Sequence, residues 1–168
     1  MGEASQLLKA RYARMDIAIV QFPQTRVAAV EHQGPPEVEH ESVKRLIDWR
    51  IQNNFPPSPK HRTYGLHYND SRKVAPDEYR VDICITVEAD IPPNSYGVIN
   101  KLIPACRCAR ARHVGSRKNV TAAEYLYEKW LPASGEKLAG LPIIFHYVNV
   151  GPHVQDHEMI TDVYLPLA

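Results

Sequence analysis

The chain has 168 residues, of which 44% are hydrophobic and 23% are charged, a length and composition typical of one globular domain and too short for two of ordinary size. Its 20 Lys and Arg residues are balanced by 19 Asp and Glu residues, so no overall field draws the protein to nucleic acid or to an anionic membrane. No apolar run approaches the roughly 20 residues that span a bilayer, and residues 1–15 lack the apolar core of a signal peptide. We therefore expect a cytoplasmic protein.

The first half of the chain predicts the order strand, strand, helix, strand, strand. The strands are expected over residues 17–22, 26–32, 64–69 and 81–88, and the last of them alternates strictly between apolar and polar side chains. Between the second and third strands, Val43, Leu46, Ile47 and Ile51 recur at helical spacing. We expect a helix whose apolar stripe faces a sheet.

The second half predicts the same order. Strands are expected over residues 97–103, 106–113, 143–149 and 160–167. A helix is expected from about Thr121, where Thr121 and Glu124 have the spacing of a capping box. Pro92, Pro93 and Asn94 indicate a linker between the halves.

The two halves also match residue by residue. At a shift of 81 positions the second half places like on like for the pairs Pro23 and Pro104, Arg26 and Arg107, Ala28 and Ala109, His32 and His113, Gly34 and Gly115, and Trp49 and Trp130. Beyond the tryptophans the shift becomes 80, which pairs Asn69 with Asn149 and Asp82 with Asp162. Ordered self-similarity of this kind indicates a duplicated structural unit, with coincidental matching as the alternative. We expect a single domain, residues 1–168, with repeat 1 at about 15–88, a linker at 89–96 and repeat 2 at about 97–168.

An ordered set of short motifs resembles those of the GyrI-like small-molecule-binding domains. These motifs are Arg26-Val27-Ala28, Gly34-Pro35, Tyr64 to Asp70, Tyr79 to Asp82, Arg107, His113-Val114-Gly115, Trp130-Leu131-Pro132 and Thr161 to Pro166. Domains of this family form the effector-binding half of AraC-type and MerR-type transcription activators, and occur alone in the bacterial DNA gyrase inhibitor protein. The resemblance implies an α+β fold, with antiparallel sheets and two main helices. Its β-β-α-β-β module is duplicated about a pseudo-twofold axis with a central cleft.

The resemblance also bears on the ligand. Drug-sensing relatives carry a buried glutamate on the third strand of the second copy, where it meets lipophilic cations. Matching the motifs places Phe145 at that position, or His146 if the alignment slips by one residue. A phenyl ring does not compensate a buried cation as a carboxylate does, although its face attracts one by about 0.5–2 kcal/mol. We therefore expect an apolar or aromatic ligand and leave cation selectivity open.

Alternation along the third strands sends Gly65 and His67 of one copy, and Phe145 and Tyr147 of the other, to matching faces. If that face lines the cleft, these four residues contact the ligand. The further candidates are Trp49, Tyr68, Trp130, His146 and Tyr164, because concave ligand sites use large aromatic side chains with a few polar tips. Packing within the core is the alternative for each of them.

Other chemistries have weaker signals. Cys106 and Cys108 share a strand face and His153 and His157 share a loop, but neither cluster has the second ligand pair that zinc sites need, so we expect no metal and no cofactor. An odd total of three cysteines argues against a disulfide framework. The basic residues Arg107, Arg110, Arg112, Arg117 and Lys118 suit phosphates or an acidic protein partner, or simply a solvated strand edge.

We therefore expect a stand-alone module that binds a small lipophilic or aromatic molecule, either neutral or cationic, and lacks a DNA-binding domain. Two alternatives remain. One is a protein-binding regulator, for example of DNA gyrase. The other is a hydrolase that uses His67 or His146 in the cleft, although no catalytic constellation is visible.

Overall fold

The computed structural model describes residues 16–56 and 58–168, so the segment 1–15 lies outside the described part of the chain. The strands are β1 (Ile17–Phe22), β2 (Thr25–Gln33), β3 (Thr63–His67), β4 (Arg80–Thr86), β5 (Ile99–Ile103), β6 (Cys106–Val114), β7 (Ile143–Tyr147) and β8 (Ile160–Pro166). The longer helical segments are α2 (Glu39–Gln52) and the continuous run α3 (Ala122–Tyr125), η4 (Leu126–Trp130) and α4 (Leu131–Ser134). Single turns η1 (Pro36–Val38), η2 (Pro76–Glu78), η3 (Arg117–Asn119) and η5 (Asp156–Glu158) precede α2, β4, α3 and β8.

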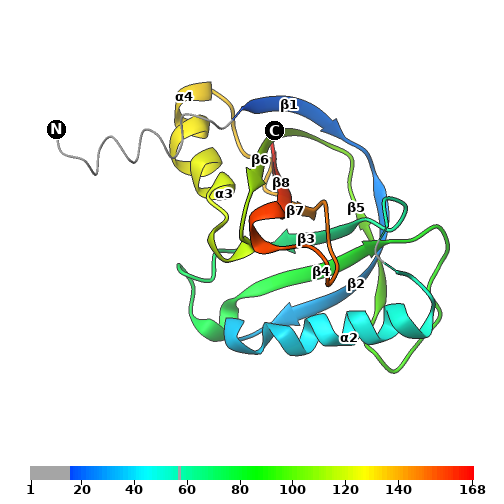
Figure 1. Cartoon of the computed structure of the whole chain (residues 1–168). Coiled ribbons are helices and arrows are strands. Elements are labelled where there is room, and N and C mark those ends of the chain that lie inside the picture. The colour runs from blue at the N-terminus through cyan, green and yellow to red at the C-terminus, as the bar shows by residue number, and fades with distance from the viewer. Residues whose placement is uncertain (1–15, 57) are drawn as a thin grey trace.

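The eight strands form one antiparallel sheet in the order β1-β6-β8-β7-β3-β4-β2-β5 (Figure 1). This order reads the same backwards when each strand of the first half is replaced by its counterpart in the second half. The outermost strands are exchanged, because β1 pairs with β6 of the second half and β5 pairs with β2 of the first. The predicted α+β class and the duplicated β-β-α-β-β plan are confirmed, and the exchange ties the two halves into one sheet.

Strand register follows the shifts found in the sequence. Ala28 pairs with Ile85 in the first copy, and Ala109 pairs with Leu165 in the second. Ala109 lies 81 positions after Ala28 and Leu165 lies 80 positions after Ile85, so the equivalent residues pair in both copies. The central strands β3 and β7 pair with each other, and Gly65 lies opposite Phe145, its own equivalent. A residue paired with its equivalent lies beside the twofold axis. The pseudo-twofold axis therefore passes between Gly65 and Phe145.

Both helices cover the same face of the sheet. A row of directly paired residues crosses the sheet in the order Val30, Ile83, Gly65, Phe145, Val163 and Ala111, and directly paired residues point to one face. Leu46 and Trp49 of α2 share a core cluster with Val30 and Ile83, while the second helix shares one with Val163 and Ala111. Figure 1 shows α2 along β2 and β4, and α3 beside β6 and β8. On this face of the sheet, the pseudo-twofold axis emerges between the two helices.

A third core cluster lies on the opposite face of the sheet. It includes Phe22, Tyr64, Leu66 and Cys84, which occupy the other alternation of the same strands. The domain therefore has two faces with separate packing, and only one carries the helices.

Two helix expectations need correction. Leu46 of the predicted apolar stripe is buried, but Ile47 and Ile51 are 46% and 75% exposed, so the stripe does not face the sheet along its whole width. The second helix begins at Ala122 as expected, yet the Thr121 side chain makes no capping hydrogen bond. That helix also takes a π-helical path over Leu126–Trp130, an irregularity that α2 lacks.

Candidate ligand-binding site

Gly65, His67, Phe145 and Tyr147 lie together beside the axis. The ring centroids of His67 and Phe145 are 4.4 Å apart, and those of Phe145 and Tyr147 are 6.5 Å apart. A Cβ atom added at Gly65 would lie 2.9 Å from the Tyr147 hydroxyl and 3.3 Å from His67 Nε2. The missing side chain of Gly65 therefore leaves space that the Tyr147 hydroxyl and the His67 ring border from two sides.

His67 is the first polar group of this cluster. Its Nε2 atom is buried and has no hydrogen-bond partner among the described residues. Burial lowers the pKa of His67 to about 4, with Glu39 and Asp70 opposing the shift, so the ring is neutral at pH 7. A neutral imidazole nitrogen without a partner in the described part of the chain offers one hydrogen bond to a bound molecule.

A carboxylate approaches the cluster from α2. The Tyr79 hydroxyl donates a 2.6 Å hydrogen bond to Oε1 of Glu39, in the first turn of that helix. Burial, followed by the charge of Glu39, raises the pKa of Tyr147, and the Arg117 guanidinium lies 5.1 Å from the Tyr147 ring centroid. Negative charge thus reaches the axis from Glu39, although the β7 position expected to match the family glutamate is Phe145.

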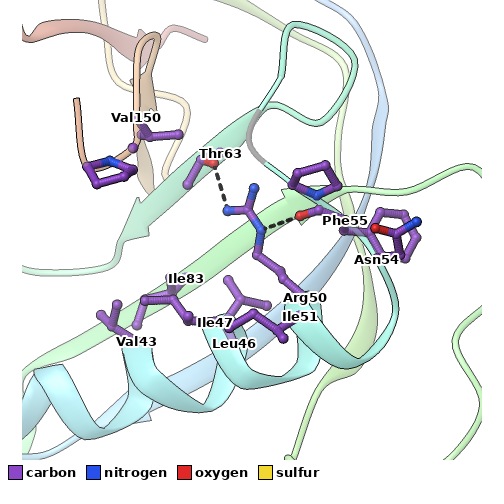
Figure 2. Close-up of a pocket in the computed structure, with 13 residues that line it drawn as sticks. Val43, Leu46, Ile47, Arg50, Ile51, Asn54, Phe55, Thr63, Ile83 and Val150 are labelled. Atoms are coloured by element: carbon purple, nitrogen blue, oxygen red, sulfur yellow. Dashed lines mark hydrogen bonds between the residues drawn. The ribbon is translucent and has the colours of Figure 1, made fainter. Parts of the chain in front are cut away.

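Groove 1 lies beside the cluster, between α2 and residues 150–152 after β7, and has a volume of about 610 Å³. Figure 2 shows the residues that line it. Most of its surface is hydrocarbon, from Val43, Leu46, Ile47, Ile51, Phe55 and Ile83. The exposed part of the α2 stripe therefore forms a groove wall.

Arg50 is the charged residue of groove 1. Its Nε donates to the Phe55 carbonyl at 3.0 Å and its Nη1 to Thr63 Oγ1 at 3.4 Å, as Figure 2 shows. Its Nη2 is buried without a partner, and burial lowers the pKa of the guanidinium. The groove thus combines apolar walls with one incompletely bonded cation.

Groove 2 occupies the equivalent place in the other copy, between the second helix and residues 69–73 after β3, with a volume of about 330 Å³. His67, Tyr127, Ile143 and Phe145 form part of its wall. Its charges are mixed, because Arg72 forms ion pairs with Asp70 at 2.9 Å and with Glu124 at 3.9 Å. Groove 2 is therefore smaller and more polar than groove 1.

The five other residues predicted for the site lie outside the axis cluster. Trp49 is 5% exposed and stacks on Phe55 at 5.2 Å, and Trp130 packs against the core under the second helix. Tyr68, His146 and Tyr164 have side chains that reach the opposite face of the sheet. The Tyr68 hydroxyl donates to Asp82 at 2.6 Å, although Tyr68 also forms part of the wall of groove 2. The ring centroid of His146 lies 4.9 Å from that of Tyr64, and the ring centroid of Tyr164 lies 5.1 Å from that of Phe22. Strand alternation separates these three from the axis cluster.

Arg50, Thr63, Glu39 and Tyr79 were not predicted as site residues. A signal for Arg50 was present, since it continues the helical spacing of Val43, Leu46 and Ile47 and so places a charge on an apolar stripe. Glu39 and Tyr79 meet only through tertiary structure, and their sequence separation of 40 residues carries no local pattern.

Much of the predicted basic run is engaged within the chain. Arg107 forms two hydrogen bonds with Glu136, at 2.9 and 2.7 Å, and Arg112 forms two with Asp162, at 2.8 and 3.0 Å. Arg117 donates to the carbonyls of Asn149 and Ile160. Within residues 16–56 and 58–168, no group of three or more His, Cys, Asp or Glu residues is arranged to hold a metal ion. No helix in these ranges has the length and apolar character of a membrane span.

Together, the twofold α+β fold and the paired grooves beside an aromatic axis define a small-molecule-binding domain. The family model for the GyrI-like small molecule binding domain matches residues 15–168. The chain belongs to this family.

The chain is also similar to named relatives. Over 155 residues the chain is 39% identical to a protein of Escherichia coli K12 named "Probable transcriptional regulator YgiV", covering 92% of this chain and 97% of the relative. This chain is also 27% identical to a protein of Erwinia billingiae named "DNA gyrase inhibitor", and the match covers 92% of this chain and 98% of that relative.

Among solved structures, the EcmrR C-terminal domain matches with a TM-score of 0.73 and 18% identity, covering 92% of this chain and 98% of that domain. The chain spans 63% of the longer EcmrR chain seen in a DNA complex. The structure of SAV2435 bound to tetraphenylphosphonium matches with a TM-score of 0.53 and 9% identity, covering 91% and 94%.

Proposed function

We propose that this protein binds small apolar, mainly aromatic molecules in the grooves beside its twofold axis and acts in the cytoplasm as a ligand-responsive regulator. The observation that carries the proposal is the pairing of apolar grooves with buried nitrogens that lack partners. Groove 1 and groove 2, at about 610 and 330 Å³, fall in or near the range of about 300–1,000 Å³ common for ligand sites. Arg50 lines the first groove and His67 lines the second, and each carries a buried nitrogen, Nη2 and Nε2, that has no hydrogen-bond partner among the described residues.

A buried polar group without a partner lowers stability by about 1–3 kcal/mol. A ligand that hydrogen-bonds to such a group recovers this loss, while its apolar body covers the hydrocarbon walls. Two such groups, in residues that line the two grooves, therefore support ligand binding there. The regulator role is supported by the relative at 39% identity, which is named as a probable transcriptional regulator.

The aromatic axis and Glu39 favour an aromatic ligand that tolerates positive charge near His67 and Phe145. A cation over a ring face gains about 0.5–2 kcal/mol, and the Glu39 carboxylate adds negative charge nearby. The neighbour SAV2435 was solved bound to a lipophilic cation, tetraphenylphosphonium. We therefore choose this cation as the first probe for groove 2.

A thermal-shift titration tests the proposal. Tetraphenylphosphonium and neutral aromatic compounds are added to the wild type, to Phe145→Ala and Tyr147→Ala, and to His157→Ala as an exposed control. We expect at least one class to raise the melting temperature of the wild type and the control, and to raise that of the axis variants less. No stabilisation by any aromatic class would contradict the proposal, and stabilisation that is indifferent to both axis variants would remove groove 2 from it.

Likeness to a protein named DNA gyrase inhibitor, at 27% identity over nearly its full length, supports a second candidate, modulation of gyrase through protein contacts. Arg107 and Arg112 are already paired with carboxylates of this chain, so the basic strand is less available for a partner than the sequence indicates. A gyrase supercoiling assay with increasing amounts of the protein decides the matter. Unchanged supercoiling at large excess removes this candidate.

A further inference from the structure

Arg50 lies in a partly apolar setting without a counter-ion. Its two hydrogen bonds go to neutral oxygens, the Phe55 carbonyl and the Thr63 hydroxyl. No carboxylate of residues 16–56 or 58–168 forms an ion pair with it, and burial alone accounts for its lowered pKa. A buried charge is normally paired or hydrogen-bonded through all its donors, because removing it from water is costly.

The guanidinium is also held in a defined direction. Bonds through Nε and Nη1 fix its plane between α2 and β3, and Nη2 remains as the free corner. In Figure 2 the guanidinium lies in the middle of the residues that line groove 1. Since the Thr63 hydroxyl accepts from Nη1, its own proton is left to donate to the same incoming oxygen.

We propose that groove 1 is a site for an organic anion, with a carboxylate or sulfonate bound to Arg50 and Thr63 and an apolar body lying on Val43, Ile47 and Ile51. This inference rests on the proposed function, and it adds the charge of the ligand and the residue that selects it. Hydrogen bonds between a guanidinium and a carboxylate are charge-assisted and roughly twice as strong as neutral ones. Ile47 and Ile51, 46% and 75% exposed, would lose water contact beneath such a ligand.

The other copy of the module shows that Arg50 is not required by the fold. At the equivalent position, 81 residues later, the chain has Leu131. Val43 of groove 1 is replaced by Glu124 in groove 2. An anion is therefore expected to prefer groove 1, where the cation is present and no carboxylate lines the wall among the described residues.

Isothermal titration with matched ligands tests the charge preference. The probes are 2-naphthoate, which is an anion, and 2-naphthamide, which has nearly the same shape and is neutral. We expect the wild type to bind 2-naphthoate at least tenfold more tightly than 2-naphthamide. Decanoate forms a third arm, because it separates an alkyl acid from an aromatic acid as the preferred carboxylate.

Three variants locate the effect. Arg50→Leu copies the residue of the second repeat, and we expect it to weaken 2-naphthoate binding at least tenfold while 2-naphthamide changes less than threefold. Arg50→Lys keeps the charge but not the fork, and should retain part of the preference. Lys44→Gln removes one positive charge from the exposed side of the same helix and should leave both affinities within twofold.

The outcomes separate the two proposals. If both naphthalenes bind equally to the wild type and to Arg50→Leu, the anion site is wrong while the proposal that the protein binds aromatic ligands stands. If neither acid nor amide binds the wild type, the anion site is wrong and groove 1 is lost from the proposed function as well. Far-ultraviolet circular dichroism of each variant confirms that the compared proteins are folded.

Discussion

Groove 1 and groove 2 occupy equivalent places in two copies of one module, but their side chains differ in charge and shape. Arg50 corresponds to Leu131, Val43 to Glu124 and Leu46 to Tyr127. The strand pairings of the two copies, in contrast, keep the same register. Backbone pairing is shared by both copies because a one-residue slip would turn every apolar side chain to the wrong face. Groove walls are free of that constraint and have diverged.

The axis has diverged too, and this matters more for the shape of the site. His67 corresponds to Tyr147, and Gly65 corresponds to Phe145. Two side chains of the size of Phe145 facing each other at the axis would leave no space for the Tyr147 ring over Gly65. The residues at the axis therefore differ between the two copies, as the residues of the two grooves do. The variants below test this difference between the copies.

The largest expected difference concerns the tryptophans, Trp49 and Trp130. Trp49 is 5% exposed and stacks on Phe55, whereas Trp130 is only partly buried against its core. We expect Trp49→Ala to lower the free energy of unfolding by about 3–5 kcal/mol and Trp130→Ala by clearly less. Urea denaturation of both variants measures this. Equal losses would show that the two helices are anchored alike in spite of the π-helical segment.

The next difference is a pH effect that only groove 2 should show. The folded-state pKa of His67 is about 4, below the value of about 6.5 expected when the chain is unfolded. Above about pH 6.5 the ring is neutral in both states; as the pH falls towards 4 the unfolded chain takes up the proton first, and stability falls by up to about 3 kcal/mol. Urea denaturation of the wild type and of His67→Gln from pH 7.5 to 4 should give curves that converge as the pH falls. Parallel curves would mean that His67 titrates normally.

A smaller effect is expected at Gly65. Alanine there would bring its Cβ to 2.9 Å from the Tyr147 hydroxyl, and overpacking of this kind costs about 1–3 kcal/mol. Removing the hydroxyl with Tyr147→Phe should relieve most of that loss in the double variant. A double-mutant cycle of unfolding free energies provides the test, and strictly additive losses would show that Tyr147 does not lie over Gly65 in solution.

The smallest effect is expected for the stability of Arg50→Leu. This variant loses two hydrogen bonds to neutral oxygens and also removes a partly buried cation without a counter-ion. Because these contributions oppose each other, we expect the unfolding free energy to change by less than about 1 kcal/mol. Chemical denaturation checks this. A loss of several kcal/mol would instead show that Arg50 is needed for the stability of the fold.

Several features followed from local patterns in the sequence. Period-two alternation predicted the eight strands within a few residues of their observed bounds, and helical spacing predicted a helix in each half, because these periods arise from backbone geometry. The two sequence shifts predicted the duplication. Alternation also placed Gly65, His67, Phe145 and Tyr147 on one face, and these four residues do meet beside the axis.

The sequence by itself determined the repeat, the order of elements and the shared face of β3 and β7. Only the tertiary structure decided that β1 and β5 exchange between halves, that Ile47 and Ile51 line a groove, and that Arg50 lies there without a counter-ion. The physical reason is that burial and charge pairing depend on which distant segments pack against a residue. Local periodicity carries no information about those segments, so groove 1 became visible only when α2, β3 and the loop after β7 were brought together.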